Sequence, residues 1–112
     1  MPRFKLTFFV PVKDTQTVLN HVFAKFPNNV GKIGEYESCA FVSPGTGQFK
    51  PGPKANPTIG HPGQVEFVEE NKVEVVVTDV ASNAITKAVI KELKSVHPYE
   101  EVAYDVYRLE DF

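Results

Sequence analysis

Five apolar residues between positions 65 and 77 fall on odd numbers, and their phase is kept across a polar stretch from Glu69 to Lys72. The residues are Val65, Phe67, Val73, Val75 and Val77. A period of two indicates β-structure, and its unbroken phase predicts one strand from Gln64 to Thr78 rather than two strands around a turn. At about 3.3 Å per residue this strand spans about 50 Å, more than the width of a compact domain with a radius of gyration of about 13 Å. The strand must therefore extend as an arm whose backbone edges need a partner.

The rest of the chain alternates strand and helix signals. Strands are predicted at Phe4–Val12, Glu35–Val42 and Val102–Leu109, and helices from Asp14 to Phe26 and from Asp79 or Ser82 to Val96. The order strand, helix, strand, strand, helix, strand is that of the split βαβ arrangement. We expect an α+β fold, a ferredoxin-like βαββαβ sandwich, as one domain over residues 1–112. Both helices would cover one face of an antiparallel sheet and leave the other face for association.

The segment from Ser43 to Gly63 holds five of the nine prolines and five of the seven glycines. This composition predicts a structured excursion between strands. Within it Gly45-Thr46-Gly47 predicts a tight turn, because the Lys-Ser or Lys-Thr of a phosphate-binding loop does not follow the last glycine. His61, between Gly60 and Pro62, has a constrained backbone and is a candidate second ligand.

Composition excludes several classes of partner. The net charge of −2 has interspersed signs, so we expect no nucleic-acid or membrane-surface binding. The single cysteine, Cys39, excludes an internal disulfide and fits a reducing compartment. Arg3 and Lys5 interrupt any signal-peptide core, and no apolar run reaches the roughly 20 residues of a membrane span. We expect a soluble cytoplasmic protein.

The main candidate site is His97-Pro98-Tyr99-Glu100-Glu101, between the second helix and the last strand. The helix cannot continue through Pro98, so the corner presents an imidazole, a phenol and two carboxylates within five residues. Two interpretations remain open. The corner is either a ligand or metal site, or a structural turn in which His97 and Tyr99 pack and the glutamates are solvated.

As a metal site, the corner would bind a soft or borderline divalent ion through His97 and Glu101, with Cys39 or His61 completing the set. As a site for a small ligand, it would use His97, Tyr99, Glu100 and Glu101 together with Tyr36 and Cys39, near contacts between subunits. A protonated His97 would be favoured by the negative end of the helix dipole.

Two groups of apolar residues would be explained by contact with another subunit. Phe9 interrupts the polar face of the first strand, and the last strand carries apolar or aromatic residues on both faces. One face of the last strand would cover the helices, and the other points to a subunit contact. Scattered exposed apolar residues are the alternative explanation for Phe9.

Several motifs recur in order along the chain. They are Gly34-x-Tyr36-x-x-Cys39-x-Phe41, Gly45-x-Gly47-x-Phe49-x-Pro51, Ala55-Asn56-Pro57-x-Ile59-Gly60 with Gly63, and His97-Pro98-Tyr99-Glu100-Glu101-x-Ala103-Tyr104-Asp105. Together they resemble the inserted domain of the Nif-three-like family, also called the GTP cyclohydrolase type 2 homologues, a domain that also occurs as a free-standing small protein. That domain is similar in fold to PII signalling proteins and CutA, which are trimers. The resemblance implies a PII/CutA-like sandwich with an extended central strand pair, assembled as a homotrimer with strand pairing between subunits in the range from Glu35 to Thr78.

The resemblance also implies a function. It implies a small trimeric module that binds a metal or small ligand in a regulatory or structural role. The dinuclear metal site of full-length members lies on flanking domains and its motifs have no counterpart here, so we expect no catalysis by this chain alone. The alternatives are a small enzyme that uses His97, Glu100 and Glu101 for acid–base or metal-assisted chemistry, and a scaffold without a ligand.

Overall fold

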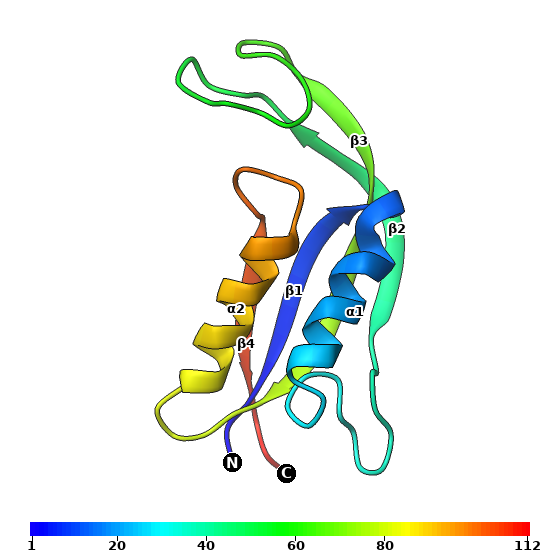
Figure 1. The fold of residues 1–112 in the computed structure, drawn as a ribbon, viewed down its shortest axis with the longest axis vertical. Coiled ribbons are helices and arrows are strands. Elements are labelled where there is room, and N and C mark those ends of the chain that lie inside the picture. The colour runs from blue at the N-terminus through cyan, green and yellow to red at the C-terminus, as the bar shows by residue number, and fades with distance from the viewer.

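Four strands form one antiparallel sheet in the order β2-β3-β1-β4, joined by two helices (Figure 1). The computed structural model describes all 112 residues. Its elements are β1 (Arg3–Pro11), a short 3-10 helix (Val12–Asp14), α1 (Thr15–Lys25), β2 (Phe41–Phe49), β3 (Glu66–Thr78), α2 (Ala84–Val96) and β4 (Tyr104–Leu109). The predicted α+β, ferredoxin-like βαββαβ order is confirmed. Neither helix is long and apolar enough to cross a membrane.

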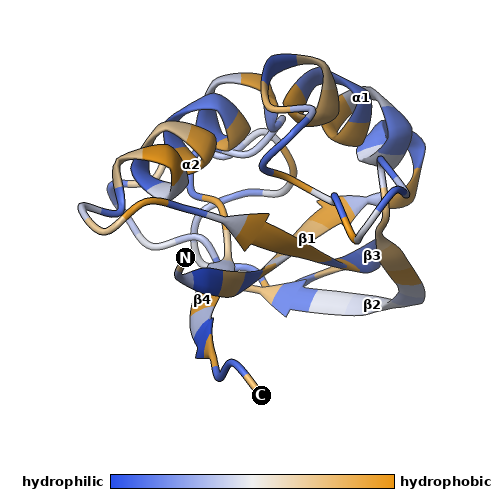
Figure 2. Ribbon diagram, turned by 90° about the horizontal axis from the view of Figure 1, so that it is seen from below, coloured by the Kyte–Doolittle hydropathy of each residue, from blue (hydrophilic) through white to orange (hydrophobic).

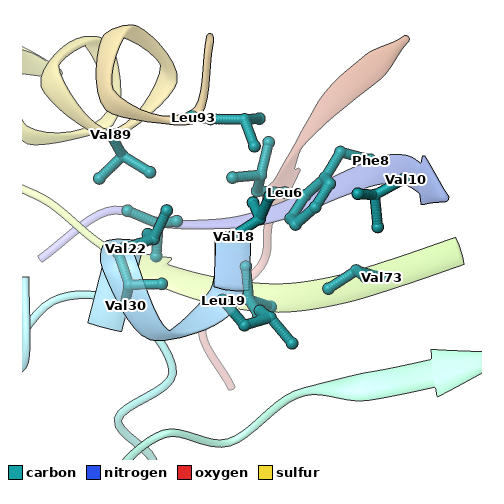
Figure 3. Close-up of a cluster of buried hydrophobic side chains, with 12 residues drawn as sticks. Leu6, Phe8, Val10, Val18, Leu19, Val22, Val30, Val73, Val89 and Leu93 are labelled. Atoms are coloured by element: carbon teal, nitrogen blue, oxygen red, sulfur yellow. The ribbon is translucent and has the colours of Figure 1, made fainter. Parts of the chain in front are cut away.

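The protein has two layers, because both helices pack on the same face of the sheet (Figure 2). Alternate residues of β1 and β3 point toward the helices and meet the apolar stripes of α1 and α2 (Figure 3). The resulting core consists of Leu6, Phe8, Val10, Val18, Leu19, Val22, Val30, Val73, Val75, Val77, Val89 and Leu93. Full burial of each such side chain contributes about 1.5–3 kcal/mol. The opposite face of the sheet has no layer of its own.

The predicted long strand is confirmed as β3, which runs for 13 residues from Glu66 to Thr78. β1 pairs with β3 only from Glu70 onward, where Glu70 lies opposite Pro11. The first four residues of β3 pair with β2 alone and form a two-stranded arm. The arm lengthens the molecule to 45 × 26 × 25 Å and raises its radius of gyration to 15.0 Å, against about 13 Å for a compact domain of this size.

The prediction of the second strand at Glu35–Val42 is wrong, since β2 runs from Phe41 to Phe49. Residues 31–40 instead form turns, in which Gly31, Gly34 and Ser38 have positive φ angles. The predicted tight turn at Gly45-Thr46-Gly47 is also wrong, because these residues lie inside β2 opposite Glu70, Glu69 and Val68. Pairing with the long β3 overrides the poor strand propensity of this glycine-rich segment.

The first and last strands of the protein are neighbours in the sheet. Arg3 lies opposite Leu109, its guanidinium forms an ion pair with Asp111 at 3.2 Å, and it donates a hydrogen bond to the carbonyl of Glu110 at 3.2 Å. The two ends of the chain therefore lie side by side (Figure 1).

The start of α2 depends on the buried carboxylate of Asp79, one of the two residues predicted to cap it. Asp79 is fully buried and accepts hydrogen bonds from the backbone N–H groups of Val80 at 2.6 Å, Ile85 at 3.1 Å and Thr86 at 2.7 Å, as well as from the Thr86 hydroxyl. Burial alone would raise the pKa of Asp79, but these donors outweigh it and hold the pKa below its usual value. The carboxylate thus satisfies donors that the first turn of a helix cannot pair internally.

We expect Asp79→Ala to lower the free energy of unfolding by about 2 kcal/mol, because it leaves buried donors without an acceptor. Because the pKa of Asp79 is lower in the folded state, its stabilisation is complete above the unfolded value near 3.8 and is lost as the pH falls through the lowered folded value. Denaturant melts at several acidic pH values would measure both effects. Asp79→Asn should flatten the pH dependence, and an unchanged acid slope in that variant would contradict this role.

Candidate functional site

The corner between α2 and β4 is fastened to β1 by the ring of His97. His97 follows the last residue of α2, and its backbone N–H donates to the carbonyl of Leu93 at 3.0 Å. The Nε2 atom lies 2.6 Å from the carbonyl oxygen of Phe9, and the backbone N–H of Tyr99 donates to Nδ1 at 3.1 Å. Because a carbonyl only accepts and an amide N–H only donates, Nε2 carries the proton and Nδ1 is the acceptor.

This arrangement favours a neutral His97. The side chain is buried, and burial lowers the pKa of the imidazole below its usual value. The hydrogen bond to Phe9 and the carboxylates of Glu70 and Asp14 act in the opposite direction without offsetting burial. The expectation of a protonated His97 at the helix end is therefore wrong, since loss of water around the ring outweighs the dipole.

Tyr99 connects the corner to the arm. Its hydroxyl donates to a carboxylate oxygen of Glu70 in β3 at 2.8 Å, and its ring lies against Phe49 and His97. Burial and then the hydrogen bond to Glu70 raise the pKa of the phenol well above its usual value. The Glu70 side chain crosses directly over Gly47, where an added Cβ would overlap its carboxylate. Gly47 thus leaves the space in which the Glu70 carboxylate lies when it reaches Tyr99.

The loop between β2 and β3 folds back onto the same corner. The backbone N–H of Asn56 donates to the Glu100 carboxylate at 2.9 Å, and the Thr58 hydroxyl donates to the carbonyl of Pro98 at 2.8 Å. A further backbone bond, from Gly63 to Pro51 at 2.8 Å, closes the base of the loop. The loop is therefore attached to the corner through groups distant in sequence.

A cavity of about 250 Å³ lies where this loop, the corner and the end of β1 meet. We call it the corner cavity, and its lining consists of Phe9, Phe49, Pro51, Ala55, Pro57, Thr58, Ile59, Tyr99, Glu100, Glu101 and Ala103. The walls are mainly apolar, and two carboxylates are the only ionisable groups besides the Tyr99 phenol. A mainly apolar concavity with a few polar groups is typical of sites for small organic ligands.

The structure brings some of the predicted site residues together and separates others. Tyr99, Glu100 and Glu101 line the corner cavity, while His97 lies behind Tyr99 with both ring nitrogens occupied. The others do not line it: Tyr36 and Cys39 belong to the turn segment that precedes β2, and His61 is exposed in the loop. No group of three His, Cys, Asp or Glu side chains in the chain is placed to hold a metal ion, so the predicted metal ligands do not form a site within one chain.

Most of the apolar lining was missed at the sequence level. Phe49, Pro51, Ala55, Pro57 and Ile59 all belong to the motifs that carry the family resemblance, which is the signal that pointed to them. Phe9 had a second signal, because it is an apolar residue on the otherwise polar side of its strand. Outside the site, His21 in α1 is partly buried and contacts Glu92 at 3.2 Å.

We expect Gly47→Ala to displace the Glu70 carboxylate from Tyr99 and lower the free energy of unfolding by about 1.5 kcal/mol, the lower end of the contribution of a hydrogen bond to a charged group. Its effect should not add to that of Tyr99→Phe, because both remove the same bond. Gly45→Ala is the matched control, since an added Cβ at that position in β2 meets nothing. Equal destabilisation by the two alanines in denaturant melts would refute the role of Gly47.

Sequence comparison shows which known proteins this chain resembles. No protein-family model matches it. It is 46% identical over 106 residues to the GTP cyclohydrolase 1 type 2 homolog of Halalkalibacterium halodurans, covering 95% of this chain and 27% of that protein. The homologue of the same name from Listeria monocytogenes is 43% identical over 110 residues, covering 97% of this chain and 28% of that protein. The chain thus spans about a quarter of the length of the curated relatives it matches.

Solved structures agree with this assignment. A Bacillus cereus protein related to NIF3 superposes with a TM-score of 0.76 at 36% identity, over 98% of this chain and 26% of that chain. The divalent cation tolerance protein CutA from Archaeoglobus fulgidus superposes with a TM-score of 0.64 at 13% identity, over 98% of this chain and 86% of that one. GlnK of B. subtilis gives 0.53 at 15% identity, over 97% of this chain and 86% of that one. The fold is thus CutA-like and PII-like, and the chain is similar in sequence and structure to one segment of the longer NIF3-related GTP cyclohydrolase 1 type 2 homologues.

Proposed function

We propose that this protein is a homotrimeric PII/CutA-like module that binds a small ligand in the corner cavity, in a regulatory or structural role and without catalysis of its own. The observation that carries this proposal is the sheet face that the helices leave uncovered (Figure 2). Its two outermost strands also have a free backbone edge, because β2 and β4 each pair on one side only. Uncovered sheet faces and free edges are the features through which such modules associate.

The exposed aromatic residues support association through these edges. Phe41 in β2 is 66% exposed and Tyr107 in β4 is 56% exposed. Phe41 is paired with Glu74 and Tyr107 with Lys5, so both aromatic side chains lie on the uncovered face, at opposite borders of the sheet. When the β2 edge of one copy joins the β4 edge of the next, Phe41 and Tyr107 lie on the same side of a continuous antiparallel sheet. A repeated contact between two different edges closes into a ring when the rotation between copies is a whole fraction of a turn, and one third of a turn gives the proposed trimer.

The ligand part of the proposal rests on the corner cavity. Its volume, mainly apolar walls and convergent polar groups suit a small organic molecule. The β2–β3 loop lines the cavity and is attached to Pro98 and Glu100, so an occupant would further stabilise this arrangement of the loop and of the arm that carries it. A bound molecule would thereby influence the strands proposed to contact a neighbouring copy, which is the basis for a regulatory role.

The state of His97 supports a binding role over an acid–base role. Both ring nitrogens are engaged by backbone groups, and burial holds the imidazole neutral. The carboxylates that act on the pKa of His97 are those of Glu70 and Asp14, and they raise it less than burial lowers it. The imidazole would have to abandon a backbone partner before it exchanged a proton with a substrate.

We expect the purified protein to show a mass of three times the 12.5 kDa chain in light scattering at micromolar concentration. Phe41→Asp should convert it to a smaller species, because the change places a carboxylate in the proposed contact. Phe67→Asp is the matched control, since Phe67 is 65% exposed but lies on the other face of the arm, opposite Gln48. A monomeric wild type, or equal dissociation of the two variants, would contradict the proposed assembly.

We also expect no hydrolysis of nucleotides or phosphoesters by this chain with added divalent metals. The reason is that one chain assembles no group of three metal-ligating side chains. The measurement is phosphate release after repeated purification. Metal-dependent turnover that persists through purification and disappears in His97→Ala would favour the enzyme alternative instead.

A further inference from the structure

We infer that the ligand of the corner cavity is a small organic cation, with one ring or a branched apolar body and a single amine or amidine group. This inference deepens the proposed function and rests on its claim that the corner cavity is a ligand site. It follows from three properties of the cavity: its size, the chemistry of its walls and the sign of the charge at its rim.

Size limits the apolar body of the ligand. A cavity of about 150 Å³ lined by apolar side chains holds one benzene ring, and drug-sized ligands occupy clefts from about 300 Å³ upward. The corner cavity, at about 250 Å³, falls between these limits and suits a single ring with a short chain. A nucleotide, with its base, sugar and phosphates, exceeds this space.

The walls select an apolar body. Phe9, Phe49 and Ile59 supply the larger apolar surfaces, and the edges of Pro51 and Pro57 complete them. The proline rings are rigid, and the hydrogen bonds of Asn56 and Thr58 to the corner hold the loop in place. A site whose walls are ordered before binding loses little conformational entropy when the ligand enters.

The rim selects a positive charge. Glu100 and Glu101 both line the cavity, and no lysine, arginine or histidine does. Glu100 already accepts from the Asn56 N–H, whereas Glu101 takes part in none of the ion pairs of the chain, which are Arg3–Asp111, His21–Glu92 and Lys25–Glu92. Glu101 is thus a free carboxylate beside an apolar cavity, the environment in which an ammonium or amidinium finds both a counter-ion and a place for its carbon skeleton. Phosphates and carboxylates would be repelled.

The experiment compares three probes that share a phenylethyl group and differ in charge, by calorimetric titration of the assembled protein. The probes are 2-phenylethylamine, 2-phenylethanol and 3-phenylpropionate. We expect the amine to bind about threefold to fivefold more tightly than the alcohol, the effect of one solvent-exposed carboxylate, and the propionate to bind most weakly. Added salt should weaken the binding of the amine more than that of the alcohol.

Variants test whether the preference for the amine over the alcohol arises from Glu101. Glu101→Gln should bring the affinity ratio of amine to alcohol close to one, whereas Glu110→Gln removes an equal charge beyond the far end of β4 and should leave the ratio unchanged. Ala103→Leu should weaken the binding of every probe, because it fills the cavity. The mass of each variant in light scattering separates these effects from loss of assembly.

The outcomes distinguish the inference from the proposed function. If all three probes bind with equal affinity and Ala103→Leu weakens them, the cavity is a ligand site but its preference for a cation is refuted. Tightest binding of the propionate would likewise refute the preference for a cation. If no probe binds at about 10 mM, where weak fragments of this size are detectable, both the ligand role of the cavity and the cation inference are refuted.

Discussion

The burial of only one face of the sheet is the constraint on which the rest of this structure depends. The core lies between that face and the two helices, and Leu6, Phe8 and Val75 are almost completely buried there. The other face carries a mixture of charged and aromatic side chains, with Thr7 enclosed at its centre by its neighbours. A sheet with this asymmetry can fold as a single chain, because one face forms the core with the helices. The other face remains available for contact with another copy, which is the basis of the proposed assembly.

The polar contacts at the corner give the arm its position. His97 joins the end of α2 to β1, Tyr99 joins the same corner to Glu70, and Asn56 returns from the loop to Glu100. Each bond links segments that are far apart in sequence. Together these bonds fix the positions of the groups that surround the corner cavity. The cavity is therefore a product of tertiary structure and not of any one motif.

Much of the fold could be predicted from the sequence because its signals are periodic. The odd-numbered valines of β3 and the apolar stripes of the helices keep their phase over many residues, so both were recognised. The strand at Phe41–Phe49 was not, because Gly45 and Gly47 are typical of turns and become a strand only through pairing with β3. At the site, Tyr99, Glu100 and Glu101 were predicted from their chemistry. Packing of His97 was one of the two interpretations of the corner, but its hydrogen bond to the Phe9 carbonyl could not be predicted, since that bond depends on how β1 lies against the corner.

The pairing of the first strand with the last has a consequence for how such a segment can be carried by other proteins. Because Arg3 and Leu109 face each other, the chain enters and leaves the sheet at nearly the same point. A unit with adjacent ends can be spliced into a surface loop of a host protein without separating the host segments on either side. Gain or loss of the whole unit then becomes a single genetic event that leaves the host core intact, which suits a segment that corresponds to about a quarter of its longer relatives.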